Sequence, residues 1–330
     1  MSRQRFGWAV VLFSLLSGGC ATTVELSETY MKPAEINMLG RKTVVLEAKS
    51  MSGSSQSDVG MVLGRLSQAL LAQEFTVVDR SSMDAKAREQ FFSDEPEVEI
   101  ESASVLIRVG ILRNTVKTER EKEEKINWIA LAVDDDDSDK EYMAYRTVAR
   151  ADTEVSFDVV DLGSMAVLTS STIKSSKSVS SDWSREGYGS VDSAAALSKS
   201  YDDVIDQFMR KIAPYTVKVD HDIYSMSDTM PQASVGVALL QAGNASRAYE
   251  EFSMALDIAR SQPEPDSKSI AQLLHNMAVA REYDDLFEEA LELYVESTRY
   301  DPDIDQSSNI ARLQQRLRDK SALEAQGVDV

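Results

Sequence analysis

The chain has 330 residues, a formal charge of −20 at pH 7 and a sequence pI near 4.6. Such an acidic chain has no basic stripe that could displace counterions from phosphates, so we expect no nucleic-acid partner. A single cysteine excludes a disulfide within the chain, and the length suffices for about two domains.

Residues 1–19 have the composition of a lipoprotein signal peptide that ends at the chain's only cysteine. Two arginines precede the apolar run Phe6–Leu16, which has the length of a signal-peptide core and is short for a membrane span. The run leads to "LSGGC" at 16–20, and small residues before a cysteine resemble a bacterial lipobox. The resemblance implies lipidation of Cys20. Because Ala21 rather than Asp follows, it implies attachment to the periplasmic face of the outer membrane of a Gram-negative bacterium. An ordinary signal peptide with an incidental cysteine is the alternative.

Residues 20–41 show little periodicity and are predicted to form a tether between the anchor and the folded part. A strand, a helix and a second strand then follow. β-branched residues predict a strand over Thr43–Ala48, and apolar residues at helical spacing predict a helix over Val59–Leu70. Phe75–Val78 is the second predicted strand. This small unit cannot bury both of its faces, so the fold requires more strands.

Three more strands and a helix complete a predicted α+β domain over residues 42–216. Ser104–Thr118 is expected to be a strand, and Thr147–Asp161 alternates apolar with polar residues, which places one strand face on a core. A turn and the returning run Met165–Thr172 predict a hairpin. An apolar stripe over Leu197–Ile212 predicts a helix that packs against the resulting mixed sheet.

These elements resemble the family of the curli secretion channel lipoprotein (CsgG). Its wider relatives include the N-terminal domain of TolB and the lipoprotein activator of penicillin-binding proteins. The resemblance covers roughly residues 40–215 and rests on "VVDR" at 77–80 and on the strand–turn–strand "VVDLGSMAVL" at 159–168. It implies a mixed sheet with packed helices, and rings in which each protomer contributes two hairpins to a membrane pore.

The two candidate hairpin segments depart from that pattern. The charged insert 119–145 and the segment 170–184 lack an apolar residue at every second position. A charged side chain that faces lipid near the midplane costs about 2–4 kcal/mol. We therefore expect residues 119–145 to form a solvated loop or a β-excursion, and a curli-type secretion channel is kept as an alternative.

Residues 231–330 have the pattern of an all-α tetratricopeptide helical-hairpin domain. Small and aromatic residues recur in two units, with Ala248 and Ala290 in matching positions and a Pro-rich insert between the units. Phe252 and Tyr294 are expected to fill the gaps between helices. The segment 307–325 is predicted to be a C-terminal capping helix. Residues 217–230 are predicted to link the two domains or to add an edge strand.

Stacked repeats leave a concave surface, formed mainly by the first helix of each repeat, on which a protein or peptide partner can bind. Gln241, Asn276 and Arg281 are the candidate partner-binding residues on that surface. We expect no catalytic residues, metal ligands or cofactor. The Ser/Gly loop 51–57 lacks a phosphate-binding motif, and the aspartate run 134–139 lacks EF-hand spacing.

The sequence therefore favours a non-enzymatic, outer-membrane-anchored periplasmic lipoprotein that acts as a scaffold or adaptor for protein partners in envelope assembly or secretion. Whether the protein forms homo-oligomers is left open. A curli-type channel and an activator of a cell-wall synthase are the two alternatives.

Overall fold

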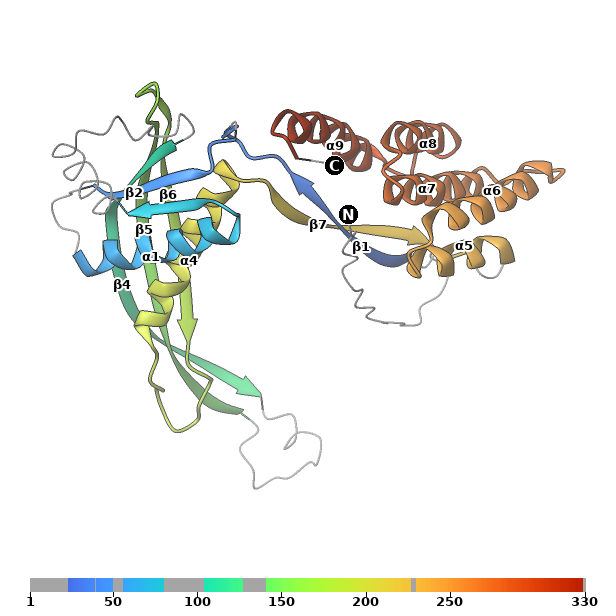
Figure 1. Ribbon diagram of the computed structural model, residues 1–330. Coiled ribbons are helices and arrows are strands. Elements are labelled where there is room, and N and C mark those ends of the chain that lie inside the picture. The colour runs from blue at the N-terminus through green and yellow to red at the C-terminus, as the bar shows by residue number, and fades with distance from the viewer. Residues whose placement is uncertain are drawn as a thin grey trace. The chain divides into compact units, whose positions relative to one another are not determined.

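The computed structural model describes residues 23–38, 40–49, 56–79, 104–126, 141–226 and 230–328 (Figure 1). The chain divides into two compact units. The helical unit comprises Met1–Met31 and Thr216–Lys320, and the sheet unit comprises Lys32–Tyr215 and Ser321–Val330. The described residues form several helices and a mixed sheet, which confirms the predicted α+β class. The predicted signal peptide and Cys20 lie outside the described residues.

The sheet unit is built on a five-stranded mixed sheet. β2 lies between β3 and β4 and runs parallel to both, whereas the β4–β5 and β5–β6 pairs are antiparallel. In spatial order the strands are β3 (Thr76–Asp79), β2 (Thr43–Ala48), β4 (Ser104–Ile126), β5 (Glu141–Asp161) and β6 (Val167–Ser180). The sequence predicted a mixed sheet and the order of these strands along the chain, but not their order in space.

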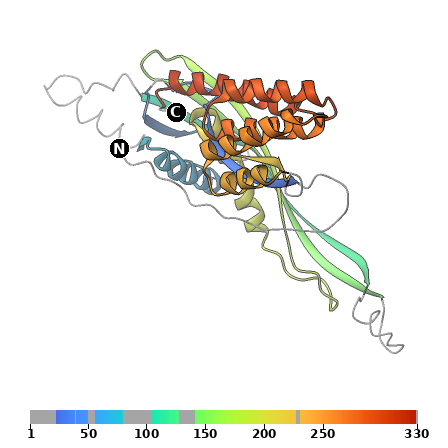
Figure 2. The same cartoon turned by 90° about the vertical axis from the view of Figure 1, so that its right-hand side faces the viewer.

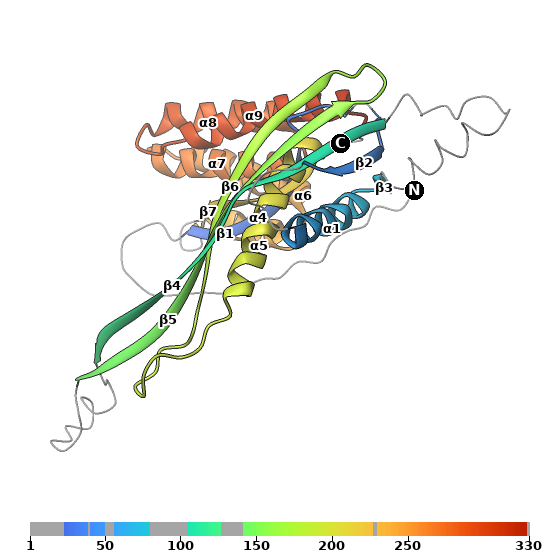
Figure 3. The ribbon, with the colours of Figure 1, turned by 90° about the vertical axis from the view of Figure 1, so that its left-hand side faces the viewer.

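Two helices, α1 (Gln56–Ala72) and α4 (Ser193–Ile212), cover one face of this sheet (Figure 3). Their apolar stripes are buried against the inward residues of the central strands. The rings of Phe157 on β5 and Phe208 on α4 stack with their centroids 4.1 Å apart. Burying each aromatic or aliphatic side chain of this kind contributes about 1.5–3 kcal/mol to the stability of the fold. The helices and strands that periodicity predicts therefore share one hydrophobic core.

Beyond that core, β4 and β5 continue as a long antiparallel pair (Figures 2 and 3). The sequence predicts either a solvated loop or a β-excursion for the insert 119–145. Its described parts, 119–126 and 141–145, are strand, so they form a β-excursion. The segment after β6 packs on this pair through Trp183. Its ring lies 4.4 Å from Lys125 Nζ and 4.5 Å from the Arg146 guanidinium carbon. Such cation–π contacts add stability to the outer part of this strand pair.

The described part of the helical unit contains five helices, and neighbours along the chain from α5 to α8 pack on one another. They are α5 (Pro231–Gln241), α6 (Ala245–Ser261), α7 (Ser267–Tyr283), α8 (Phe287–Tyr300) and α9 (Ser307–Ala325), whose residues from Ser321 onward belong to the sheet unit. Phe252 and Tyr294 are fully buried between helices. In α7, every residue from Ile270 to Ala280 is buried. The assignment of these helices to the tetratricopeptide class stays a prediction.

A second sheet, of two strands, pairs β1 (Thr23–Lys32) with β7 (Tyr215–Tyr224). The predicted tether over residues 20–41 is therefore wrong for its described part. The predicted linker over residues 217–230 begins with a strand, the alternative named for it. The tether prediction failed because β1 needs only Leu26 in the core, and its polar residues make specific contacts that periodicity does not reveal.

Across the described ranges, no helix combines the length and the apolar character that crossing a membrane requires.

Candidate functional site

Five charged or titratable side chains meet inside the helical unit. β7 alternates exposed and buried residues near its end, and His221 is one of the buried ones. Glu28 comes from β1, Glu282 from the end of α7, and Arg312 and Arg316 from α9, where a spacing of four residues places them on one face. We call this group the ion-pair cluster.

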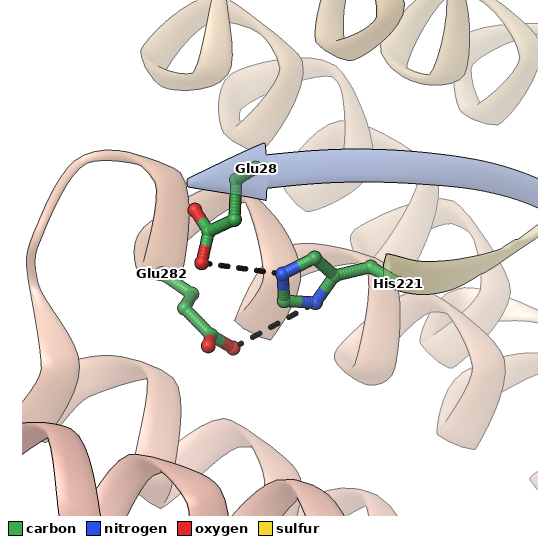
Figure 4. A group of neighbouring side chains, drawn as sticks. All are labelled: Glu28, His221 and Glu282. Atoms are coloured by element: carbon green, nitrogen blue, oxygen red, sulfur yellow. Dashed lines mark ion pairs between the residues drawn. The ribbon is translucent and has the colours of Figure 1, made fainter. Parts of the chain in front are cut away.

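The imidazole lies between the two carboxylates (Figure 4). His221 Nε2 is 3.3 Å from Glu28 Oε1, and His221 Nδ1 is 3.9 Å from Glu282 Oε2. One possible ligand atom from each of these three residues lies within 4.8 Å of the others. Imidazole and carboxylate groups are the ligand types of zinc and other transition metals, so the group has the composition of a metal site.

The two arginines do not fit a metal site. Arg312 binds both carboxylate oxygens of Glu282, with Nη2–Oε2 at 2.9 Å and Nε–Oε1 at 3.1 Å. Arg316 Nη1 lies 2.9 Å from Glu282 Oε1 and also pairs with Glu28. The two guanidinium charges already balance the two carboxylate charges, and they bind both oxygens of Glu282 and one oxygen of Glu28. A divalent cation placed there would meet two fixed positive charges at close range.

The cluster is instead arranged as a buried ion-pair network that joins strands to helices and stabilises the fold. Burial alone would raise the pKa of Glu282. The hydrogen bond from Arg312 and the surrounding positive charges, those of Arg312 and Arg316 included, lower this pKa below its usual value. Glu282 is therefore ionised at neutral pH although its side chain is inaccessible. Removing one partner from such a buried pair is strongly destabilising, so the cluster holds β1 and β7 against α7 and α9.

A neutral polar group next to the cluster holds the end of β7 by its backbone. Asn276 accepts a hydrogen bond from Tyr224 N at 3.0 Å and donates one to Tyr224 O at 2.9 Å. His275 Nε2 donates to Asp222 O at 2.7 Å, while Nδ1 accepts from Gln306 Nε2 at 3.0 Å. Burial lowers the pKa of His275, which keeps the imidazole neutral in this tautomer.

The structure separates the three predicted partner-binding residues. Asn276 is fully buried and its amide is used by Tyr224, so the prediction that it contacts a partner is wrong. Arg281 is half-buried, stacks 3.5 Å from the ring centroid of Tyr249 and pairs with Glu289 at 3.0 Å. Gln241 is half-buried at the end of α5. Gln241 and Arg281 stay predictions.

Sequence reasoning missed the ion-pair cluster. Its members come from four elements, β1, β7, α7 and α9, and none belongs to a recognisable motif. The one available signal was the spacing of Arg312 and Arg316 on a predicted helix, and a pair of this kind on a helix is usually solvated. One of the carboxylates that these arginines bind, Glu28, lies on β1, a segment that the sequence predicts to be a tether.

No family model and no curated protein matches this chain. Among solved structures, two of the PelC dodecamer from Paraburkholderia phytofirmans, one of them a point variant, are 16% and 15% identical. They cover 57% and 58% of this chain and 98% of their own, with TM-scores of 0.26 and 0.27. A homologue of a putative neuraminyllactose-binding hemagglutinin from Helicobacter pylori is 15% identical over 54% of this chain and 85% of its own, with a TM-score of 0.27. Likenesses this weak assign no family to the chain.

Proposed function

We propose that this protein is an outer-membrane lipoprotein facing the periplasm, where it acts as a non-enzymatic scaffold for protein partners in envelope assembly or secretion. The observation that carries the proposal is the position of Cys20. The chain's only cysteine ends an apolar leader and stands three residues before the first strand of the folded part. A lipid on this thiol would hold the protein at the membrane without a spanning segment.

The helices support the scaffold part of the proposal. The face of α7 that carries His275 and Asn276 is taken by the chain's own strand β7. Partners are therefore expected on the remaining helix surfaces. On α6, Met254 and Ile258 lie one turn apart and are 47% and 43% exposed. Large apolar side chains exposed next to one another are typical of protein-binding surfaces.

Metabolic labelling with a palmitate analogue tests the anchor. The wild-type protein should be labelled and should fractionate with the outer membrane, whereas Cys20→Ala should be unlabelled and soluble. Ala21→Asp should stay lipidated and move to the inner membrane, and Thr22→Ala, the matched control, should behave as wild type. An intact mass that shows an unmodified chain starting at Met1 would overturn the proposal.

A curli-type secretion channel is the second candidate, because β4 and β5 continue far beyond the helix-covered sheet. The exposed charged residues on the outer part of β4 oppose it, since they alternate poorly with apolar ones. Light scattering on the Cys20→Ala protein decides between the two. A large ring that is lost when residues 119–145 are replaced by a short turn would favour the channel. A monomer in both cases would favour the scaffold.

A further inference from the structure

The first described strand is an integral part of the helical unit. β1 starts at Thr23, and its Leu26 is only 8% exposed. Leu26 shares a hydrophobic core with Ile223 of β7 and with the buried residues of the helices. Val24, two residues earlier, packs against the same core. The chain is therefore built into the folded unit almost from the first residue of β1.

Polar contacts fix the next residues of β1 as well. Ser27 Oγ donates to Asp220 Oδ1 at 2.5 Å, and Glu28 belongs to the ion-pair cluster. The Arg316 guanidinium lies 4.6 Å from the ring centroid of Tyr30. A strand held by core packing, strand pairing and buried ion pairs does not pull away from its helices to lengthen a tether.

Covalent geometry limits how far Cys20 can be from this strand. Each residue spans at most about 3.6 Å, so the three steps from Cys20 to Thr23 reach about 11 Å. A flexible segment of about 20 residues would instead give a mean separation of roughly 25 Å and a far longer maximum. The anchor therefore has almost no slack.

We infer that the helical unit is held directly on the bilayer surface, with the first residues of β1 against the lipid headgroups. This inference rests on the proposed lipidation of Cys20. Acidic residues outnumber basic ones in this unit, which opposes binding to anionic lipid by charge alone, so the contact depends on the covalent anchor.

Depth-dependent quenching tests this placement. Once lipid occupies the Cys20 thiol, an introduced cysteine is the only free thiol in the chain. Thr23→Cys and, as a control in the exposed loop between α6 and α7, Glu264→Cys are labelled with bimane. The lipidated proteins are placed in phosphatidylethanolamine–phosphatidylglycerol vesicles that carry a nitroxide on the lipid headgroup. A third variant adds a Gly/Ser segment of about 20 residues between Thr22 and the Thr23→Cys site.

The label at Thr23→Cys should be strongly quenched by the headgroup nitroxide, and the inserted segment should abolish most of this quenching. Mass spectrometry of the N-terminal peptide is run on the same samples. Equal, weak quenching with and without the inserted segment, on a protein shown to be lipidated, overturns the inference and leaves the proposed function standing. An unlipidated N-terminal peptide overturns both. Quenching at Glu264→Cys as strong as at Thr23→Cys contradicts a specific contact at β1.

Discussion

Gly236, in α5, is a residue whose identity follows from a single close contact. A Cβ atom added there would lie 2.6 Å from Cε1 and 2.7 Å from Cδ1 of Phe252, a ring that is fully buried. Glycine inside a helix costs about 0.5–1 kcal/mol relative to alanine. The close approach of α5 and α6 around the Phe252 ring offsets that cost, because a larger residue would push the helices apart.

Gly236→Ala should therefore lower the free energy of unfolding by about 1–3 kcal/mol, the usual cost of overpacking, although alanine is the better helix former. Gly64→Ala in α1 is the matched control. No described atom lies within 4 Å of its added Cβ, so the variant should stabilise the protein by about 0.5–1 kcal/mol. Urea unfolding followed by circular dichroism measures both. Stabilisation by both variants would show that Phe252 has room to move.

Single residues also show where sequence reasoning works. Phe252 and Tyr294 were expected to fill the gaps between helices, and both are fully buried. Large aromatic side chains on the apolar face of a helix are buried where that face packs on its neighbours. Asn276 was expected on a binding surface. An amide on a helix has the same pattern whether it faces solvent or a buried backbone, so the sequence alone could not distinguish these cases.

At the scale of elements, side-chain amides join segments that no local pattern connects. Asn276 pairs with both backbone groups of Tyr224, and in the sheet unit Gln326 does the same for Ala34. Ala34 N donates to Gln326 Oε1 at 3.1 Å, and Gln326 Nε2 donates to Ala34 O at 2.9 Å. Each amide satisfies a backbone donor and acceptor as a neighbouring strand would, which removes the cost of leaving them unpaired.

The ion-pair cluster makes a sharper prediction about how β1 is held. Arg316→Met removes the guanidinium that pairs with Glu28 and one of the two that pair with Glu282, and it should cost about 3–5 kcal/mol of unfolding free energy. Adding Glu28→Gln removes the carboxylate charge that has lost its guanidinium, while Glu282 keeps Arg312, so the double variant should be more stable than Arg316→Met alone. Arg318→Met, an exposed arginine on the same helix, should change stability by less than about 0.5 kcal/mol.

Urea unfolding of the wild type, Glu28→Gln, Arg316→Met and the double variant measures these differences as a double-mutant cycle, with Arg318→Met unfolded alongside as the control. Equal costs for Arg316→Met and Arg318→Met would mean that the cluster contributes nothing to stability. A double variant that is less stable than both single variants would mean that Glu28 acts on β1 through other contacts.

The elements themselves were largely predictable, and their lengths and long-range pairing were not. The strands of the five-stranded sheet and helices α1 and α4 were expected, because alternating or helical apolar spacing marks one buried face. The outer halves of β4 and β5 carry charges on both faces. Pairing between the two strands, reinforced by cations over Trp183, holds them, and neither interaction leaves a periodic signal.

At the scale of the whole molecule, neither compact unit is a continuous stretch of chain. The helical unit takes its first strand from before residue 32 and the rest from after residue 215. The sheet unit takes Ser321–Val330 from the C-terminal end. A division of the sequence into consecutive domains, 42–216 and 231–330, could not find this exchange, because composition and periodicity are local properties of the chain.

This organisation predicts that residues 23–31 stabilise helices from which they are separated by most of the chain. Deleting residues 1–31 removes Leu26 from the helical core and Glu28 from the ion-pair cluster, whereas deleting residues 1–22 leaves both in place. The shorter deletion should unfold like Cys20→Ala, and the longer one should lose several kcal/mol in the helical unit, since a buried leucine alone contributes about 2–5 kcal/mol.

Hydrogen exchange resolved by mass spectrometry localises the loss. Peptides from α7 and α9 should exchange much faster after the longer deletion, because both helices contact β1 through Glu282, Arg316 and the shared core. Peptides from α1 and the core of β5 belong to the sheet unit and serve as the internal reference, with unchanged protection. Unchanged protection of α7 after the longer deletion would mean that β1 is the dispensable tether its sequence pattern indicates. A lipid on Cys20 would then be joined to the helices by a flexible segment, which would contradict the inferred placement on the bilayer.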